Sequence, residues 1–282
     1  SQDLIHEHAL KFIRDHKEQP FFAMLTYTLP HAELNLPHDS IYQMYENSFE
    51  ETPYIGKFDK VNGGYNTSEK PKASFAAMVS RLDKYVGGVM AELKELGLDK
   101  NTIVSFTSDN GPHHEGRADP DFFKSYGPFR GIKRDVYEGG IRIPMVAWCP
   151  GTIKAGAQSD HISAFWDVMP TLAELTGTVL PEQTDGISFL PTLLSKKNQQ
   201  AHDYLYWEFH ELNGREALRS GKWKLIRQPI VGETILELYD LSNDIHEDTN
   251  LAEKYPDKVK ELASLMDNAR TESPYFDFGR EK

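Results

Sequence analysis

Cysteine is nearly absent from the sequence, and long apolar runs and excess basic charge are missing altogether. The single cysteine, Cys149, cannot form a disulfide within the chain, so cysteine usage does not identify the redox compartment. A membrane span needs about 20 apolar residues in a row, and no stretch approaches that length. Basic residues number 31 against 43 acidic ones, a net charge of −12. A protein that coats nucleic acid has the opposite balance, so we exclude bulk nucleic-acid binding.

The beginning of the sequence has no initiator methionine, no basic segment and no apolar signal-peptide core. Helical spacing of apolar residues starts at once, with Leu4, Ile5, Phe12 and Ile13. We therefore expect either a processed protein or a piece of a longer one, and the motifs described below favour the piece.

The composition is that of a folded protein with an α/β core. Hydrophobic residues make up 39% and aromatic residues 11%, which excludes a disordered chain. Apolar runs predict strands at 21–27 and 103–107, and the stripe Phe75, Met78, Val79, Leu82, Val86, Met90 and Leu93 predicts a helix over 71–97. Strand, helix and strand in this order form a right-handed crossover, so we predict a mostly parallel sheet sandwiched by helices.

Further along, residues 141–151 read as another buried strand, and residues 163–177 as a helix capped near Ser163 and stopped at Gly177. The pattern changes near residue 200, where short runs of β-formers separated by turns predict an antiparallel sheet of three or four strands. A helix near 255–270 covers it. We predict two parts, an α/β portion over 1–199 and a small α+β module over 200–282.

Three polar features follow predicted core strands, where sites form in α/β proteins. Asp109 and Asn110 supply hard oxygen ligands that suit Ca²⁺ or Mg²⁺ better than zinc. Lys133 stands in a glycine-bordered loop and offers a point charge for an oxyanion. His31 follows Pro30 at the end of the first strand. Taken alone, an Asp-Asn-Gly tripeptide is usually a turn and a lysine in a loop is normally solvated. A single histidine at such a place is as often structural as catalytic.

The phrases around these residues resemble the type I sulfatases, the arylsulfatase-like branch of the alkaline-phosphatase superfamily. The resemblance covers almost the whole chain, in family order, and within the family it is most similar to bacterial exo-acting polysaccharide sulfatases. The phrases are TSDNGPH, GIKRDVYEGGIRIPMVAWCPG, SAFWDVMPTLAELTG, DGISFLPTLL, GKWKLIR and ELYDLSNDIHEDTNLA.

The resemblance implies an alkaline-phosphatase-like fold and a sulfuric-ester hydrolase that acts on a sulfated carbohydrate or an aryl sulfate. In this family a cysteine or serine becomes formylglycine, whose hydrate attacks sulfur. Asp109 and Asn110 match the later pair of calcium ligands, with Mg²⁺ as the alternative ion. Lys133 matches the lysine that contacts the sulfate. His31 matches the histidine that contacts the sulfate or protonates the leaving oxygen.

The sequence departs from the family at several points. The formylglycine motif, Cys or Ser followed by x-Pro-x-Arg, is absent, and Cys149 in WCPGT reads as a core thiol. The family's early acidic pair and early lysine–histidine pair are also absent, and His31-Ala32 replaces the usual His-Pro. We expect the chain to hold about half of an active site, to need the N-terminal part of the same enzyme, and to be inactive alone.

Other residues have weaker claims. His113, with His114 and Glu115, follows the calcium loop and could line a sugar pocket, and His210 could reach substrate from the C-terminal module. Glu138 and Arg142 are expected to tie loops together by ion pairs. His6 and His8 face different sides of a helix, so a metal site there is improbable.

Two other functions stay open at this point: a phosphatase or phosphodiesterase of the same superfamily, and a non-catalytic fragment that binds sulfated glycan. The first uses two-metal sites with several Asp and His ligands, whereas an Asp-Asn pair with a lysine fits one hard cation better. Family habit further suggests a periplasmic or secreted protein.

Overall fold

The computed structural model describes residues 2–57, 64–180, 182–273 and 275. By its internal contacts the chain divides into two compact units: Ser1–Val104 with His113–Ser125, and Ser105–Pro112 with Tyr126–Lys282. Among the described residues, no helix has the length and apolar character needed to cross a bilayer. The predicted boundary at residue 200 remains a prediction, and residues 274 and 276–282 of that module lie outside the described part.

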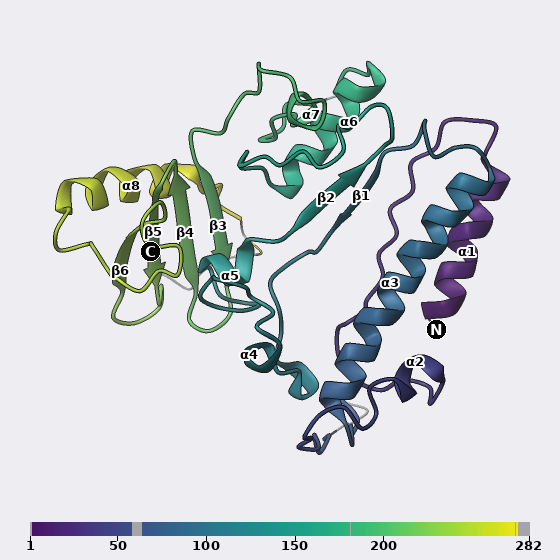
Figure 1. Cartoon of the computed structure of the whole chain (residues 1–282). Helices are drawn as coiled ribbons and strands as arrows, with labels where there is room; N and C mark the ends of the chain where they lie inside the picture. The colour runs from purple at the N-terminus through teal and green to yellow at the C-terminus, as the bar shows by residue number, and fades with distance from the viewer. Residues whose placement is uncertain (1, 58–63, 181, 274, 276–282) are drawn as a thin grey trace. The chain divides into compact units, whose positions relative to one another are not determined.

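The first unit is built on two long helices, α1 (Gln2–Asp15) and α3 (Pro71–Glu95), which lie side by side (Figure 1). Ile13, Val89 and Leu93 form the core between them. Three shorter elements complete the unit: α2 (Ser40–Gln43), the 3₁₀ turn η1 (Glu115–Arg117) and α4 (Pro120–Phe123). The predicted helix over 71–97 is confirmed to within two residues.

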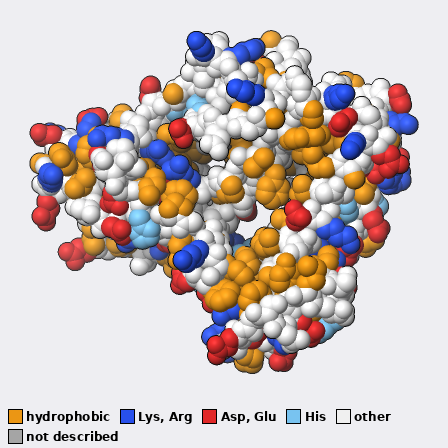
Figure 2. Space-filling view, in the orientation of Figure 1, with side chains coloured by type: hydrophobic (Ala, Val, Ile, Leu, Met, Phe, Trp, Pro, Cys, Tyr) orange, Lys and Arg blue, Asp and Glu red, His pale blue; other side chains and the backbone are white. Residues whose placement is uncertain are grey.

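The buried face of α3 differs from the predicted stripe. Arg81 is 5% exposed and Tyr85 2%, whereas Val79 of the predicted stripe is 45% exposed. Arg81 is buried because it pairs with Asp3 of α1 and with Asp39, and the Tyr85 hydroxyl donates to Asp3 at 2.7 Å. Burial and the neighbouring Asp3 raise the pKa of Tyr85 to about 12. The apolar periodicity did not predict this buried face because polar residues occupy part of it. Figure 2 shows hydrophobic side chains at the surface over α3.

The expected strand over 21–27 is not formed. Burial alternates along this segment as in a strand, with Phe22 65% and Met24 68% exposed, while Phe21 and Leu25 pack on the core between α1 and α3. A strand needs a partner for its backbone ladder, and no described segment pairs with this one.

The second unit begins with two paired strands, β1 (Val104–Thr107) and β2 (Met145–Trp148). They fall where strands were predicted, but β2 is not buried: Met145 is 42% exposed and Val146 63%. Within the described residues, the predicted main sheet consists of these two strands. The short helix α5 (Glu138–Ile141) precedes β2 in the sequence.

A helical layer follows the two strands: η2 (Phe165–Asp167), α6 (Val168–Thr176) and α7 (Leu190–Leu193). Gly177 ends α6 in the left-handed conformation, as predicted. The N-cap position of η2 is Ala164, next to the expected Ser163, and the fully buried side chain of Asp167 accepts hydrogen bonds from the backbone N–H groups of Ala164 (2.7 Å) and Ile187 (2.8 Å). The sequence did not predict these contacts of Asp167, because the residue stands among the apolar residues of a predicted helix.

The C-terminal part contains the predicted antiparallel sheet, with four strands in sequential order: β3 (Leu205–Phe209), β4 (Arg215–Ser220), β5 (Trp223–Gln228) and β6 (Ile235–Asp240). Helix α8 (Pro256–Ala269) packs on one face of it, and Leu262 and Met266 are each 1% exposed (Figure 1). Val136 and Tyr137 of the loop before α5 pack in the other core cluster of the sheet.

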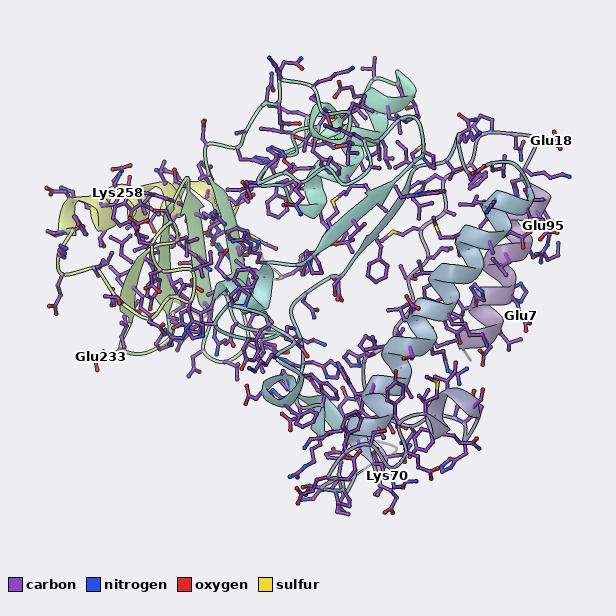
Figure 3. The ribbon with its side chains drawn as sticks, in the orientation of Figure 1. Glu7, Glu18, Lys70, Glu95, Glu233 and Lys258 are labelled. Atoms are coloured by element: carbon purple, nitrogen blue, oxygen red, sulfur yellow. The ribbon has the colours of Figure 1, made fainter. Side chains whose placement is uncertain are left out.

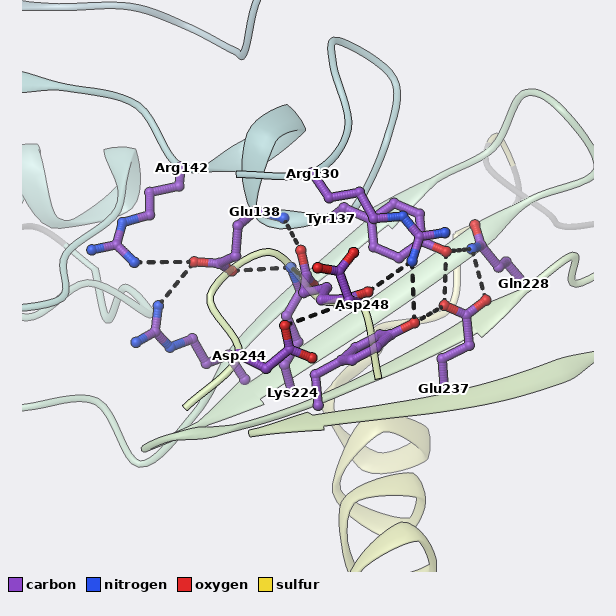
Figure 4. Close-up of polar contacts among 12 residues, drawn as sticks. Arg130, Tyr137, Glu138, Arg142, Lys224, Gln228, Glu237, Asp244 and Asp248 are labelled. Atoms are coloured by element: carbon purple, nitrogen blue, oxygen red, sulfur yellow. Dashed lines mark hydrogen bonds and ion pairs between the residues drawn. The ribbon is translucent and has the colours of Figure 1, made fainter. Parts of the chain in front are cut away.

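A buried ion network joins α5 to this sheet (Figure 4). Lys224 of β5 is fully buried, and its Nζ lies 3.0 Å from Glu138 Oε1 and 2.9 Å from Glu247 Oε1. The second oxygen of Glu138 pairs with Arg219 at 3.2 Å and with Arg142 at 3.4 Å, which confirms the expected structural role of Glu138 and Arg142. Burial opposes ionisation, yet Lys224 and Arg219 hold the pKa of Glu138 below its usual value.

We expect Lys224→Met to lower the free energy of unfolding by about 3–5 kcal/mol, because two buried carboxylates lose their shared cation. The matched control is Lys260→Met, which replaces an exposed lysine on α8 and should change stability by about 0.5 kcal/mol or less. Urea unfolding of both variants in the complete protein measures the difference. Equal midpoints for the two would refute the structural role of Lys224.

Candidate active site

The predicted site residues are distributed over both units. His31 and His113 belong to the first unit, and Asp109, Asn110, Lys133 and His210 to the second. Each group is therefore described within its own unit.

The Asp-Asn loop starts directly after β1, as the sequence predicted. Thr107 Oγ1 donates to the carbonyl of Pro144 at 2.9 Å, which ties the end of β1 to the start of β2. The side chain of Asn110 donates through Nδ2 to the carbonyl of Gly111 at 2.8 Å, so its amide orientation leaves Oδ1 as the available oxygen. Asp109 is exposed. The loop thus presents a carboxylate and an amide oxygen, both of them ligands for a hard cation.

Glycines let a second loop lie directly against the Asp-Asn loop. The N–H of Gly111 donates to the carbonyl of Gly140 at 2.9 Å. A Cβ on Gly111 would stand 1.9 Å from the carbonyl oxygen of Gly139, and a Cβ on Gly139 would stand 2.2 Å from that of Gly131. No side chain fits at these distances. The approach of the two loops therefore requires glycine at position 111, and glycine at position 139 lets the second loop lie close to Arg130 and Gly131.

Lys133 lies beside the Asp-Asn loop because its backbone N–H donates to the carbonyl of Pro112 at 2.7 Å. Asp135 holds the same turn by accepting from the N–H of Ile132 at 2.9 Å. Arg215 of β4 then donates to the carbonyl of Arg134 at 2.9 Å and pairs with Asp135. The C-terminal sheet therefore fixes the turn that carries Lys133, and the structure brings Asp109, Asn110 and Lys133 onto adjoining loops.

The histidines of the first unit lie together. The rings of His31 and His113 stack with centroids 5.0 Å apart and planes 22° apart. His31 Nδ1 is 2.8 Å from the carbonyl of Ala32, and His113 is 7% exposed. His113 Nδ1 lies 3.0 Å from Glu115 Oε2. Spacing along the sequence gave no sign of this pairing, because 82 positions separate His31 from His113.

The remaining candidates have structural partners. His210 Nε2 lies 3.1 Å from Glu208 within the C-terminal sheet, and its contact with substrate stays a prediction. Cys149 is 3% exposed, which agrees with a core thiol. His6 Nδ1 contacts the Tyr27 hydroxyl at 2.9 Å. No group of three or more His, Cys, Asp or Glu side chains arranged for a metal ion occurs within the described part of the chain.

Comparison with known proteins decides the family. A family model described as sulfatase matches residues 1–178. The chain belongs to the sulfatase family. A second model, described as the C-terminal region of N-sulphoglucosamine sulphohydrolase, matches residues 127–272 of this sulfatase chain, which agrees with the expected C-terminal location.

Among relatives, the N-acetylgalactosamine-6-O-sulfatase of Bacteroides thetaiotaomicron is 30% identical over 289 aligned positions, which cover 95% of this chain and 51% of the relative. The crystal structure of Ps i-CgsB with k-i-k-neocarrahexaose has a TM-score of 0.76 at 25% identity and covers 95% of this chain and 54% of its own. That of BT4656 with its substrate D-glucosamine-2-N,6-O-disulfate has a TM-score of 0.58 at 27% identity and covers 70% and 40%. The chain spans about half the length of the curated relatives it matches.

We predict that Gly111→Ala disrupts the Asp-Asn loop, because its Cβ would clash with a backbone carbonyl that cannot move without separating the two loops. The expected loss is about 1–3 kcal/mol of unfolding free energy, with weakened divalent-cation binding. Gly87→Ala is the control: Gly87 is exposed within α3 with nothing near its Cβ, and alanine there should stabilise by about 1 kcal/mol. Thermal unfolding and calcium titration of both variants measure these effects, and unchanged calcium affinity in Gly111→Ala would contradict the prediction.

Proposed function

We propose that the protein containing this chain hydrolyses sulfate esters and that this chain supplies the later half of its active site. The observation that carries the proposal is the joined pair of loops, which places two hard oxygen donors next to a lysine. When the sulfur–oxygen bond of a sulfate ester breaks, negative charge builds up on the sulfuryl oxygens and on the bridging oxygen. Positive groups close to that charge lower the barrier. Membership of the sulfatase family supports the same reaction.

The loop fits a hard divalent cation, for which we propose Ca²⁺. Neither the carboxylate of Asp109 nor Oδ1 of Asn110 accepts a hydrogen bond from the part of the chain that the structure describes, so both oxygens can serve as ligands. Ca²⁺ takes about 6–8 oxygens, and the remaining ligands would come from substrate, water or the rest of the enzyme. When bound, the cation would polarise the sulfuryl oxygens.

Lys133 and His31 have different proposed roles. The ammonium group of Lys133 would neutralise charge on the sulfuryl oxygens. His31 would act on the bridging oxygen: as the sulfur–oxygen bond breaks, its electron pair stays on that oxygen, and the proton of the imidazolium Nε2 moves to it. The attacking group belongs to the formylglycine motif, which this sequence does not contain.

A sulfated carbohydrate is the substrate class we propose. A relative is named for N-acetylgalactosamine 6-O-sulfate, and a solved structure holds a disulfated glucosamine. These two proteins differ in sugar and in sulfate position, so we propose the class of substrate and not one sugar.

We predict that Asp109→Ala in the complete enzyme loses bound calcium and nearly all sulfatase activity, because the carboxylate is the only charged ligand of the pair. Asp160→Ala, which removes an exposed carboxylate far along the sequence, should leave both unchanged. Metal content by atomic emission and hydrolysis of a sugar sulfate give the two readouts. Calcium at the wild-type level in Asp109→Ala would remove this residue from the site.

We predict different substrate dependences for Lys133→Ala and His31→Ala. Lys133→Ala should lower kcat/KM for a nitrophenyl sulfate and a sugar sulfate alike, by about 10²–10³-fold. His31→Ala should lower it by about 10²–10⁴-fold on the sugar sulfate and far less on the nitrophenyl sulfate, because nitrophenolate leaves without a proton. Equal losses on both substrates for His31→Ala would make it a sulfate-binding residue instead of the acid.

A further inference from the structure

The turn that carries His31 is contacted twice by His113. Besides stacking on the His31 ring, His113 places Nε2 3.1 Å from the carbonyl oxygen of Pro30, the residue directly before His31. The backbone N–H of His31 donates to Thr28 at 2.9 Å. One buried ring therefore restrains both the backbone and the side chain of the proposed acid.

The carbonyl partners of the two rings show which nitrogen of each ring donates a hydrogen bond. A carbonyl oxygen only accepts, so His113 donates from Nε2 to Pro30, and His31 donates from Nδ1 to Ala32. His113 Nδ1 then lies 3.0 Å from Glu115 Oε2, within ion-pair distance of the carboxylate. The bond from His31 Nδ1 leaves Nε2 as its atom for proton exchange with substrate.

Glu115 is itself held in place. Its side chain is 11% exposed, and it begins the turn η1, whose Gly116 packs against Ala32 and Leu34. The edge of Phe75 from α3 meets the His113 ring at 6.2 Å between centroids. The order of support thus runs from η1 to His113 and from His113 to His31.

We propose that Glu115 and His113 are positioning residues: Glu115 holds the orientation of His113, and His113 aligns His31 on the leaving oxygen. The burial of the His113 ring favours this role, and the direct sugar contact that the sequence suggested for His113 stays a prediction. The kinetic part rests on the proposed sulfatase function. Partners that orient a working histidine in this way typically contribute about 10–100-fold to activity.

The kinetic test compares Glu115→Gln and Glu115→Ala in the complete enzyme. We expect Glu115→Gln to lower kcat on N-acetylgalactosamine 6-sulfate about 10–100-fold while KM stays nearly constant. The loss of kcat on nitrophenyl sulfate should be smaller. Glu115→Ala should lower kcat more than Glu115→Gln does. Glu95→Gln, the same change at an exposed position at the end of α3 (Figure 3), should match wild type. A wild-type kcat in both Glu115 variants, or an effect confined to KM on the sugar, would overturn the proposal.

A second readout needs no turnover and no substrate. Imidazole ¹⁵N spectra of the histidine-labelled enzyme should show a proton on Nε2 of His113 and on Nδ1 of His31, with the His113 signals shifted in Glu115→Gln. A His113 spectrum unchanged by Glu115→Gln would overturn the positioning role. If wild type hydrolyses no sulfate ester while the spectra behave as expected, the proposed function fails and the positioning of His31 stands.

Discussion

The architecture of the second unit depends on one buried cation shared by two carboxylates. Lys224 is completely enclosed, and its partners Glu138 and Glu247 come from α5 and from the loop after β6. Such a network adds little net stability compared with apolar packing, but any arrangement that separates its members leaves a buried charge unpaired at a cost of several kcal/mol. The network therefore selects one placement of α5 on the sheet, which is a matter of specificity more than of stability.

That placement determines where the candidate ligands lie. Glu138 begins α5, and the glycines that follow it support the loop after β1 through the bond from Gly111 to Gly140. On the other side of the same loop, Arg215 anchors the turn of Lys133. Residues that act together in one site have to keep their spacing to within about 0.5 Å. The C-terminal sheet contributes to that rigidity by holding the turn of Lys133 through Arg215.

Local pattern was enough to predict most elements, because their signals are local. The long helix α3, the stop at Gly177 and the four-stranded sheet with α8 were all expected, and so was the position of Asp109 and Asn110 after a strand. In each of these cases periodicity or a backbone requirement acts over a few residues. The family phrases suggested roles for Lys133 and His31, which spacing alone left open, and these roles stay predictions.

The errors have a shared physical cause: they concern interactions between distant segments. Residues 21–27 have the composition and alternating burial of a strand, but a strand exists only with a partner, and periodicity cannot report whether one is present. Arg81 belongs to the buried face of α3 only because Asp3 and Asp39 neutralise it. Glu115 likewise lies near His31 only because folding brings His113 beside both residues. Candidate ligands on loops can thus be proposed from residue type and position, whereas the buried groups beside them become visible only in three dimensions.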